Sequence, residues 1–301
     1  MYEDNKWYGH RYILLRYLNI KKDRNIFAQI QHGWYGETFT GWSIKNTSIL
    51  NRICPTLAWC RKYNQDSNTK IISIGAPFLY LDKLLLKKNF KVNGTLFIPS
   101  HSRDDSENIK PYHRQGWKDI DSKGNKFTYK RNLNFFYYIK QIEKKYNPPY
   151  TVCFHPADYK NKNYISFFKK RNWHIVVAVG RNDNQSLFKL RALLLRHKNI
   201  IFSDFTSTSL LYAMYLKKKV KVISYKKDED NTIKSFEQKN KHLFKNYLNK
   251  KIAFAIASKE LGYKFIKKKS ELKKILGLSN PLKNLAAKLI GHYRDFKYKL
   301  I

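Results

Sequence analysis

The chain has 301 residues, enough for one large domain or for two of about 150 residues each. Hydrophobic residues make up 43% of it and aromatic residues 16%, which excludes a globally disordered protein. The formal net charge of +38 points to an anionic partner, which can be nucleic acid, an acidic membrane surface or a phosphorylated substrate.

The first half of the chain alternates helical patterns with short apolar runs. Apolar residues at helical spacing predict helices at 12–18, 78–87 and 133–146. Short apolar runs predict strands at 26–30, 70–74 and 95–99. The run at 55–60 fits a short strand or the start of a helix, and the polar segment 103–127 is expected to be a loop. Asn147-Pro148-Pro149 then breaks the chain and marks a natural hinge between domains.

The stretch from 150 to 225 contains two strand-turn-helix units in succession. Apolar runs predict strands at 150–154, 174–179, 199–204 and 220–224. A helix is predicted at 210–216. Short continuous apolar runs that alternate with helical patterns indicate a parallel sheet covered on both faces. In such sheets, ligands bind at the carboxyl ends of the strands, so this edge is the expected site, most readily for the phosphates of a nucleotide.

The end of the chain is mainly helical. Helical patterns cover 233–248 and 270–276, with a charged loop at 226–231 and a short apolar run at 252–256. A last helix begins at Pro281, since proline is favoured in the first helical turn.

Histidine-containing turns follow three of the predicted strands. They are His32-Gly33, Ser100-His101-Ser102 and His155-Pro156. Gly33 permits a tight turn that presents an imidazole at the sheet edge, although His32 also fits an ordinary loop position. One such turn is weak evidence, but three at predicted carboxyl edges favour a site.

A hydroxyl cluster, Thr206-Ser207-Thr208-Ser209, stands at a predicted helix start. Its hydroxyls and the first backbone amides can cap the helix, or they can hold a phosphate with help from the positive end of the helix dipole. Both interpretations remain open.

Together these motifs resemble bacterial glycosyltransferases of the two-Rossmann-domain (GT-B) type. The likeness is greatest to those with an HP motif and a later Ser/Thr pair that bind a cytidine nucleotide, such as sialyltransferases and Kdo transferases. The chain is also similar to the CDP-glycerol glycerophosphotransferases of teichoic acid synthesis, which have a His-Gly turn near the N-terminus. The matching pieces, within about residues 26–225, are 31–34, 98–102, 154–156 and 203–219.

The resemblance implies roles for individual residues. His155 and Pro156 would contact the ribose and phosphate of the nucleotide, and His32 would be the catalytic base. The phosphate would be held by Ser207, Thr208 and Ser209. The chain lacks both the acidic motif of the sialyltransferases and the lysine that glycerophosphotransferases carry after the His-Gly turn.

Four further residues are candidates for the cleft. Glu37 is a second candidate for the base, because an attacking hydroxyl must lose its proton. Arg181 is a candidate to stabilise the departing phosphate. Ser100 and His101 would line the cleft together with Gly33.

The fold that the resemblance implies is α/β, with two Rossmann-like domains, parallel sheets and an interdomain cleft. Residues 1–147 would form an acceptor domain, 148–278 a nucleotide-donor domain and 279–301 an amphipathic basic helix. The expected activity is that of a glycosyltransferase that uses a CMP- or CDP-linked sugar to extend a glycan or lipid-linked acceptor. Its product would be a cell-surface polysaccharide or lipopolysaccharide.

Two alternatives of other classes remain. One is a CDP-glycerol-type polyol-phosphate transferase, and the other is a basic nucleic-acid-binding protein. The lysines are spread over the chain and no nucleic-acid motif is present, so no specific nucleic acid partner is expected. No metal-binding DxD motif is evident, so we expect neither an essential metal nor a cofactor.

The expected location is the cytoplasm, peripheral on the inner membrane. Cys54, Cys60 and Cys153 fit neither a zinc pattern nor a disulfide framework, which favours free thiols in a reducing compartment. The first residues lack a signal peptide pattern, and no apolar stretch reaches the roughly 18 residues that span a bilayer.

The last helix is predicted to be basic and amphipathic. Its apolar residues are Leu282, Leu285, Ala286, Leu289, Ile290, Tyr293, Phe296 and Leu300. Its cations are Lys283, Lys288, Arg294, Lys297 and Lys299. Such a helix can lie in an anionic bilayer surface. Alternatively, the stripe of Leu285, Ala286 and Leu289 packs on the protein, and only the end from Tyr293 meets lipid.

Overall fold

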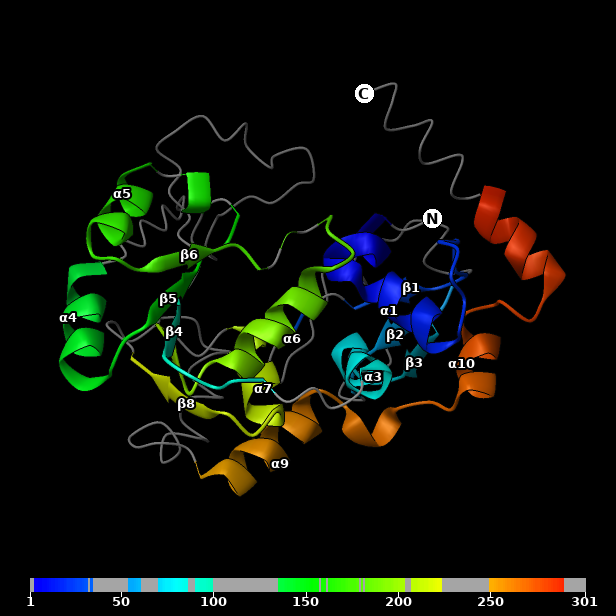
Figure 1. The fold of residues 1–301 in the computed structure, drawn as a ribbon. Coiled ribbons are helices and arrows are strands. Elements are labelled where there is room, and N and C mark those ends of the chain that lie inside the picture. The colour runs from blue at the N-terminus through cyan, green and yellow to red at the C-terminus, as the bar shows by residue number, and fades with distance from the viewer. Residues whose placement is uncertain are drawn as a thin grey trace, which may run out of the picture.

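The protein is a mixed α/β structure with two parallel sheets, seen in a computed structural model (Figure 1). This architecture is consistent with the predicted Rossmann-like folds. The structure describes residues 3–31, 33–34, 54–60, 70–85, 90–99, 135–156, 158–160, 162–178, 180, 182–203, 207–223 and 249–289. The predicted loops at 103–127 and 226–231 and the predicted helix at 233–248 lie outside these residues.

Among the described residues, the first sheet has three strands in the order β1-β2-β3, all parallel. They are β1 (Gln29–Ile30), β2 (Thr56–Ala58) and β3 (Ile71–Ser73). The run at 55–60 is therefore a strand. Around this sheet lie η1 (Glu3–Gly9), α1 (His10–Tyr17) and α3 (Pro77–Leu84), and α1 packs on α3. The predicted helix at 12–18 is confirmed, and the one predicted at 78–87 is confirmed as far as Leu84.

In the part of the chain that the structure describes, the second sheet has five parallel strands in the order β6-β5-β4-β7-β8. The strands are β4 (Thr95–Ile98), β5 (Tyr150–Cys153), β6 (His174–Val176), β7 (Asn199–Phe202) and β8 (Lys219–Val222). The chain runs outward from β4 through β5 to β6, and then crosses to β7 on the other side of β4. The point where the strand order reverses lies between β4 and β7.

The connecting helices of this sheet are α4, α5, α6 and α7. Their bounds are α4 Phe135–Lys145, α5 Lys162–Lys170, α6 Ser186–Arg196 and α7 Thr208–Tyr215. The helices α4 and α7 match the predictions for 133–146 and 210–216. The sequence analysis did not locate α5 and α6 individually, although a parallel sheet requires such crossovers.

Successive residues of each central strand enter different cores, because side chains alternate across a strand. Phe97, Val152 and Ile201 pack with α4 and α5 in a smaller cluster around Phe168. Leu96 and Ile200 belong to a larger cluster that extends through α6 and α7 into the first sheet. The sheet is thus covered on both faces, as predicted.

The point at which the chain passes from the first sheet to the second differs from the predicted domain division. The strand β4 lies before the predicted division at 147/148, yet it is the central strand of the second sheet. The chain therefore changes sheets between α3 and β4. The break at Asn147–Pro149 lies in the connection from α4 to β5, where proline also fits because it cannot continue a helix.

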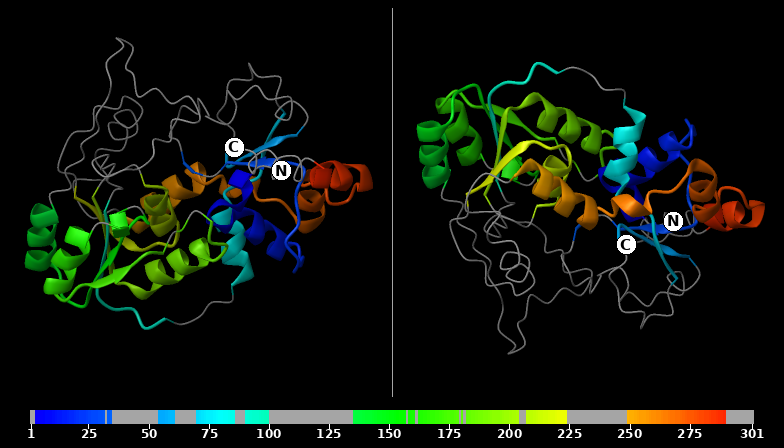
Figure 2. Two further views of the ribbon diagram at one scale, coloured as in Figure 1. Left: turned by 90° about the horizontal axis from the view of Figure 1, so that it is seen from above. Right: turned by 90° about the horizontal axis from the view of Figure 1, so that it is seen from below.

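After the second sheet the chain returns to the first. The returning elements are α9 (Lys250–Glu260), η4 (Tyr263–Phe265) and α10 (Lys269–Ile275), followed by a helix at 281–289. Figure 2 shows this segment crossing from α7 to the side of β1–β3. The apolar run at 252–256 is part of α9, and the predicted helix at 270–276 is confirmed by α10.

Backbone contacts fix this return. The Ala76 amide donates to the Leu261 carbonyl at 2.8 Å, and the Phe27 amide donates to the Leu276 carbonyl at 3.0 Å. Gly262 has φ +72°, and a Cβ there would lie 1.7 Å from the Trp59 carbonyl oxygen, so only glycine fits this crossing. None of the described helices is long and apolar enough to cross a membrane.

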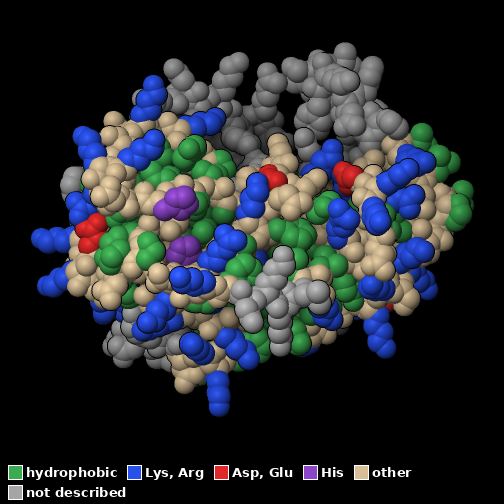
Figure 3. Space-filling view, viewed as in Figure 1, with side chains coloured by type: hydrophobic (Ala, Val, Ile, Leu, Met, Phe, Trp, Pro, Cys, Tyr) green, Lys and Arg blue, Asp and Glu red, His purple; other side chains and the backbone are tan. Residues whose placement is uncertain are grey.

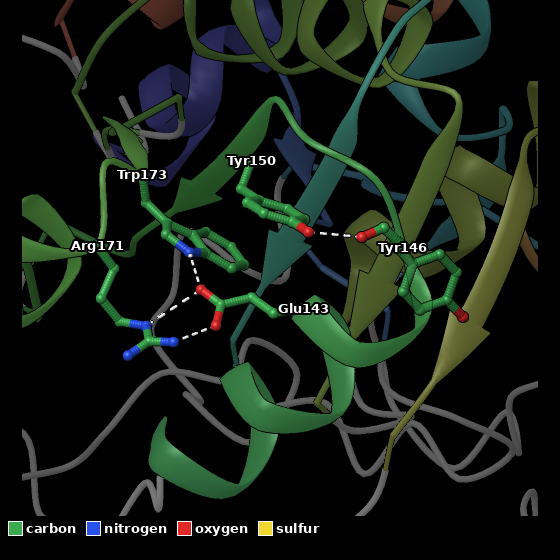
Figure 4. A network of polar contacts seen from close by, with 5 residues as sticks. All are labelled: Glu143, Tyr146, Tyr150, Arg171 and Trp173. Carbon is green, nitrogen blue, oxygen red and sulfur yellow. Dashed lines mark hydrogen bonds and ion pairs between the residues drawn. The ribbon is translucent and has the colours of Figure 1, made fainter.

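A polar cluster ties α4 to the turn before β6 (Figure 4). The Glu143 carboxylate accepts from Trp173 Nε1 at 2.9 Å and from Arg171 Nε at 3.1 Å. The Tyr150 ring stacks on the Trp173 ring with centroids 4.9 Å apart. Burial raises the pKa of Glu143, but hydrogen bonds from Arg171 and Trp173 and the Arg171 charge lower that pKa below its ordinary value overall.

We expect Glu143→Gln to lower the free energy of unfolding by about 1 kcal/mol at neutral pH, since it weakens a partly exposed, charge-assisted pair. The folded pKa is lower than the unfolded pKa of about 4.3, so this stabilisation is present above the unfolded value and is lost as the pH falls through the folded one. Urea unfolding of both proteins should therefore show a difference that shrinks in acid. Glu271→Gln, in a half-exposed pair with Lys267, is the control with a smaller effect. A difference for Glu143→Gln that persists in acid would contradict this account.

Candidate functional site

The topology gathers three strand ends at one edge of the second sheet. Because β4 lies between β5 and β7, the residues after these strands are neighbours along that edge. His155-Pro156 follows β5, Pro99 follows β4, and Ser203 follows β7. The reversal of strand order falls between β4 and β7, which is where ligands of open α/β sheets bind. The sequence prediction that these turns share the carboxyl edge is confirmed for the described residues.

The described residues of the hydroxyl cluster, 207–209, begin α7 as predicted, and Ser207 caps the helix. Its side-chain oxygen accepts from the Ser209 backbone N–H at 3.2 Å. The first turn of α7 contains no acidic residue, so no carboxylate within that turn offsets the positive end of the helix dipole. Capping is therefore observed, and the helix start retains the field that favours an anion.

Thr208 makes a contact that the sequence did not predict. Its Oγ1 accepts from the Trp34 backbone N–H at 3.1 Å. Residues 174 positions apart are thereby joined, and the Gln31–Trp34 turn lies against the start of α7. Thr208 was predicted to hold a phosphate, but its hydroxyl oxygen already accepts this structural hydrogen bond.

The Gln31 side chain holds the same turn from the other end. Its Nε2 donates to the Gly33 carbonyl at 2.7 Å, and its Oε1 accepts from the Trp59 backbone N–H at 2.9 Å. The Gln31 carbonyl also accepts from Trp59 Nε1 at 2.9 Å. Gln31 is buried, and each bond that it makes limits the conformations open to the turn.

A buried carboxylate completes this arrangement. Glu260, at the end of α9, accepts from Trp34 Nε1 through Oε2 at 2.8 Å. The turn after β1, the start of α7 and the end of α9 therefore meet around Trp34. We call the four residues Gln31, Trp34, Thr208 and Glu260 the turn clasp.

Five predicted site residues lie outside the described part of the chain. They are His32, Glu37, Ser100, His101 and Arg181. Gln31 and Gly33, on either side of His32, belong to the turn at α7, while Pro99 and Gly180 directly precede Ser100 and Arg181. The roles of all five stay predictions.

His155 and Pro156 are half-buried. The Tyr159 amide donates to the His155 carbonyl at 3.1 Å and begins η3 (Asp158–Lys160). The residues that follow this turn in the sequence line a surface hollow of about 420 Å³. It is lined by Tyr159, Lys160, Lys162, Ile165, Ser166, Lys169 and Lys170.

The four lysines of this hollow were missed in the sequence analysis. Two of them, Lys160 and Lys162, precede the apolar residues of α5, and the other two, Lys169 and Lys170, follow these residues. Residues 162, 166 and 169 share one face of a helix, so the helical spacing of the sequence could have indicated that Lys162 and Lys169 lie close together. A hollow with four ammonium groups and an exposed tyrosine suits an anionic ligand.

The cysteine nearest the site is unreactive. Cys153 ends β5 and is buried as a free thiol, and Cys54 and Cys60 are also free and buried. Burial raises the pKa of Cys153 to about 11, against a smaller opposite effect from a hydrogen bond with the Ala178 backbone. The thiol is therefore protonated at neutral pH and is no candidate nucleophile.

Among the described residues, no cluster of three or more His, Cys, Asp or Glu side chains could hold a metal ion.

Comparisons with known proteins give little further information. No family model matches the chain, and no curated protein matches it. Two solved structures of the wall teichoic acid polymerase TagF resemble it weakly. One is a histidine-to-alanine variant, with a TM-score of 0.35 and 14% sequence identity, and the match covers 93% of this chain and 71% of the TagF chain. The other has a TM-score of 0.29 at 15% identity, with coverages of 91% and 69%.

The turn clasp makes a testable contribution to stability. Thr208→Val keeps the shape of the side chain but removes the acceptor for the Trp34 amide, so we expect a loss of about 1 kcal/mol in the free energy of unfolding. Thr208→Ser keeps the hydroxyl and should lose clearly less. Urea denaturation of the parent and both variants measures this, and equal stabilities for the valine and serine variants would show that the hydrogen bond is unimportant.

Proposed function

We propose that the chain is a metal-independent glycosyltransferase that uses a cytidine-nucleotide sugar to extend a cell-surface glycan or lipid-linked acceptor. One observation carries the proposal. In a parallel sheet with a reversal of strand order, His155 follows β5 and Ser207 begins the helix after β7, and the backbone of Trp34, two residues after His32 in the sequence, is bound to Thr208, the first residue of α7. Nucleotide donor and catalytic base would then meet at the start of one helix.

The donor phosphate would bind at the start of α7. Backbone N–H groups there point along the helix axis, and the positive end of the dipole favours an anion. Ser207 would contribute its hydroxyl, while His155 and Pro156 would contact the ribose from the end of β5. Arg181 would neutralise charge on the departing phosphate.

The acceptor hydroxyl would be deprotonated by His32, with Glu37 as the second candidate. A general base must reach the proton that it removes, and it works best with a pKa near the operating pH, which histidine meets without adjustment. The bonds of Gln31 and Trp34 support this assignment, because they hold the residues around His32 in a fixed turn against α7.

A CDP-glycerol-type polyol-phosphate transferase is the second candidate. The His32-Gly33 pair favours it, because that family has a His-Gly pair near its N-terminus. The two candidates share the cytidine nucleotide and differ in the group transferred, so incubation with CMP-sugars and with CDP-polyols separates them.

Nucleotide binding can be tested apart from helix capping. Ser207→Asp and Ser207→Asn both keep an N-cap oxygen and should leave the protein folded. The aspartate adds a negative charge at the proposed phosphate position, so we expect it to weaken CMP and CDP binding at least about tenfold more than asparagine does. Thermal midpoints with CMP, CDP, UMP and UDP measure this, because a ligand of the folded state raises the midpoint.

Two outcomes would reject this site. One is equal nucleotide affinity for the aspartate and asparagine variants, and the other is the absence of a cytidine nucleotide shift in the parent. His155→Ala should weaken binding of the same nucleotides, since it removes a side chain after β5, at the same edge of the sheet.

The base is tested by kinetics. We expect His32→Ala to lower turnover by about a hundredfold or more with little change in donor affinity, because a base acts in the transition state. Glu37→Gln is the matched variant and should retain most of the turnover. Loss of donor affinity alone in His32→Ala would make His32 a binding residue, and a collapse of turnover in Glu37→Gln would make Glu37 the base.

A further inference from the structure

The helix at 281–289 exposes three large apolar side chains. Leu282 is 76% exposed, Leu285 is 54% exposed and Leu289 is 61% exposed. Among the described residues, four other large hydrophobic side chains are similarly exposed, and they are scattered over separate elements: Val92, Tyr159, Ile252 and Tyr263. Single exposed apolar residues are normal, but three on one short helix form a patch that calls for a partner.

The orientation of this helix explains the exposure. At 3.6 residues per turn, the three leucines lie within about 60° of one another, and Ala287 lies roughly opposite them. Ala287 is buried in the main core, so the helix touches the protein through its small residues. Of the stripe Leu285, Ala286 and Leu289, which was one alternative for packing on the protein, Ala286 contacts the core but the two leucines do not, because the alanine side permits the closer approach.

The start of the helix is anchored, which fixes the leucines outward. Asn280 Oδ1 accepts from the Lys283 backbone N–H at 3.1 Å, and Pro281 occupies the first turn. Lys283 packs against Phe27 near Gly277, with its Nζ 5.8 Å from the Phe27 ring centroid. The leucine face is thus held in place by the cap at Asn280 and by the contact with Phe27, two residues before β1.

The surroundings of the leucines are strongly basic. Residues 267–289 contain seven lysines and one acid, Glu271, which pairs with Lys267. Six of the lysines are exposed: Lys268, Lys269, Lys273, Lys274, Lys283 and Lys288. Figure 3 shows apolar side chains at the edge of the molecule where this helix lies, beside several Lys and Arg side chains.

We propose that this surface, formed by Leu282, Leu285, Leu289 and the surrounding lysines, docks the protein on an anionic lipid bilayer. The leucines enter the boundary between headgroups and acyl chains, and the lysines contact lipid phosphates. Charge decides the occupant. A second copy would bring the same cluster of lysines against itself in a two-fold interface, and like charges would repel. Three leucines are also a small area beside the roughly 800 Å² per partner of a stable interface.

The test is sedimentation of the full chain with vesicles of phosphatidylcholine alone or mixed with phosphatidylglycerol, at low and high salt. It needs neither donor nor acceptor, so it is independent of the proposed transferase activity. We expect binding to the anionic vesicles only, weakened by salt, because lysine–phosphate attraction is screened. The combined change Leu282→Gln, Leu285→Gln and Leu289→Gln should weaken binding by about tenfold or more.

Matched controls keep the result specific. Val92→Gln with Ile252→Gln removes two apolar residues elsewhere that are about half exposed, and it should leave vesicle binding unchanged. Ala287 is retained in every variant, and thermal midpoints verify that each is folded. Equal binding to both vesicle types would overturn the proposal, as would unaltered binding by the triple variant. Lipid-free sedimentation equilibrium showing a dimer that the triple variant abolishes would assign the face to a second copy instead.

Discussion

The structure depends on the need to cover both faces of the sheet built on β4. A parallel strand sends successive side chains to opposite sides, so Leu96 and Phe97 require separate cores. The helices α4 and α5 supply one core, and α6 and α7 supply the other. This arrangement forces the crossover from β6 to β7, and the crossover creates the reversal of strand order at which the candidate site lies.

The second core is shared with the first sheet, and this sharing joins the two halves of the protein. Phe78 of α3 stacks on Tyr212 of α7 with ring centroids 4.0 Å apart. Arg191 of α6 reaches Asp82 of α3, with Nη2 and Oδ1 2.6 Å apart. Apolar contacts of this kind favour association without specifying one orientation, whereas directional polar bonds select a single one. The turn clasp adds such bonds at the edge where the site lies.

The site and the basic helix use positive charge in different ways. At the start of α7 the field comes from aligned peptide groups and acts within the first turn. Around the helix at 281–289 it comes from mobile ammonium groups, which act over about a Debye length and are screened by salt. The first arrangement suits one phosphate group bound in a defined position, and the second suits a surface that carries many.

The sequence by itself determined the order and type of most elements and the carboxyl-edge location of His155 and Ser207, because periodicity and capping are local properties of a chain. Only the tertiary structure decided that β4 pairs with β5 and β7, that Thr208 bonds Trp34, and that Glu260 lies beneath the same turn. It also decided which way the helix at 281–289 faces, with Ala287 inward and the leucines outward. An amphipathic pattern shows that a face is apolar, but the identity of its partner depends on residues far away in the chain.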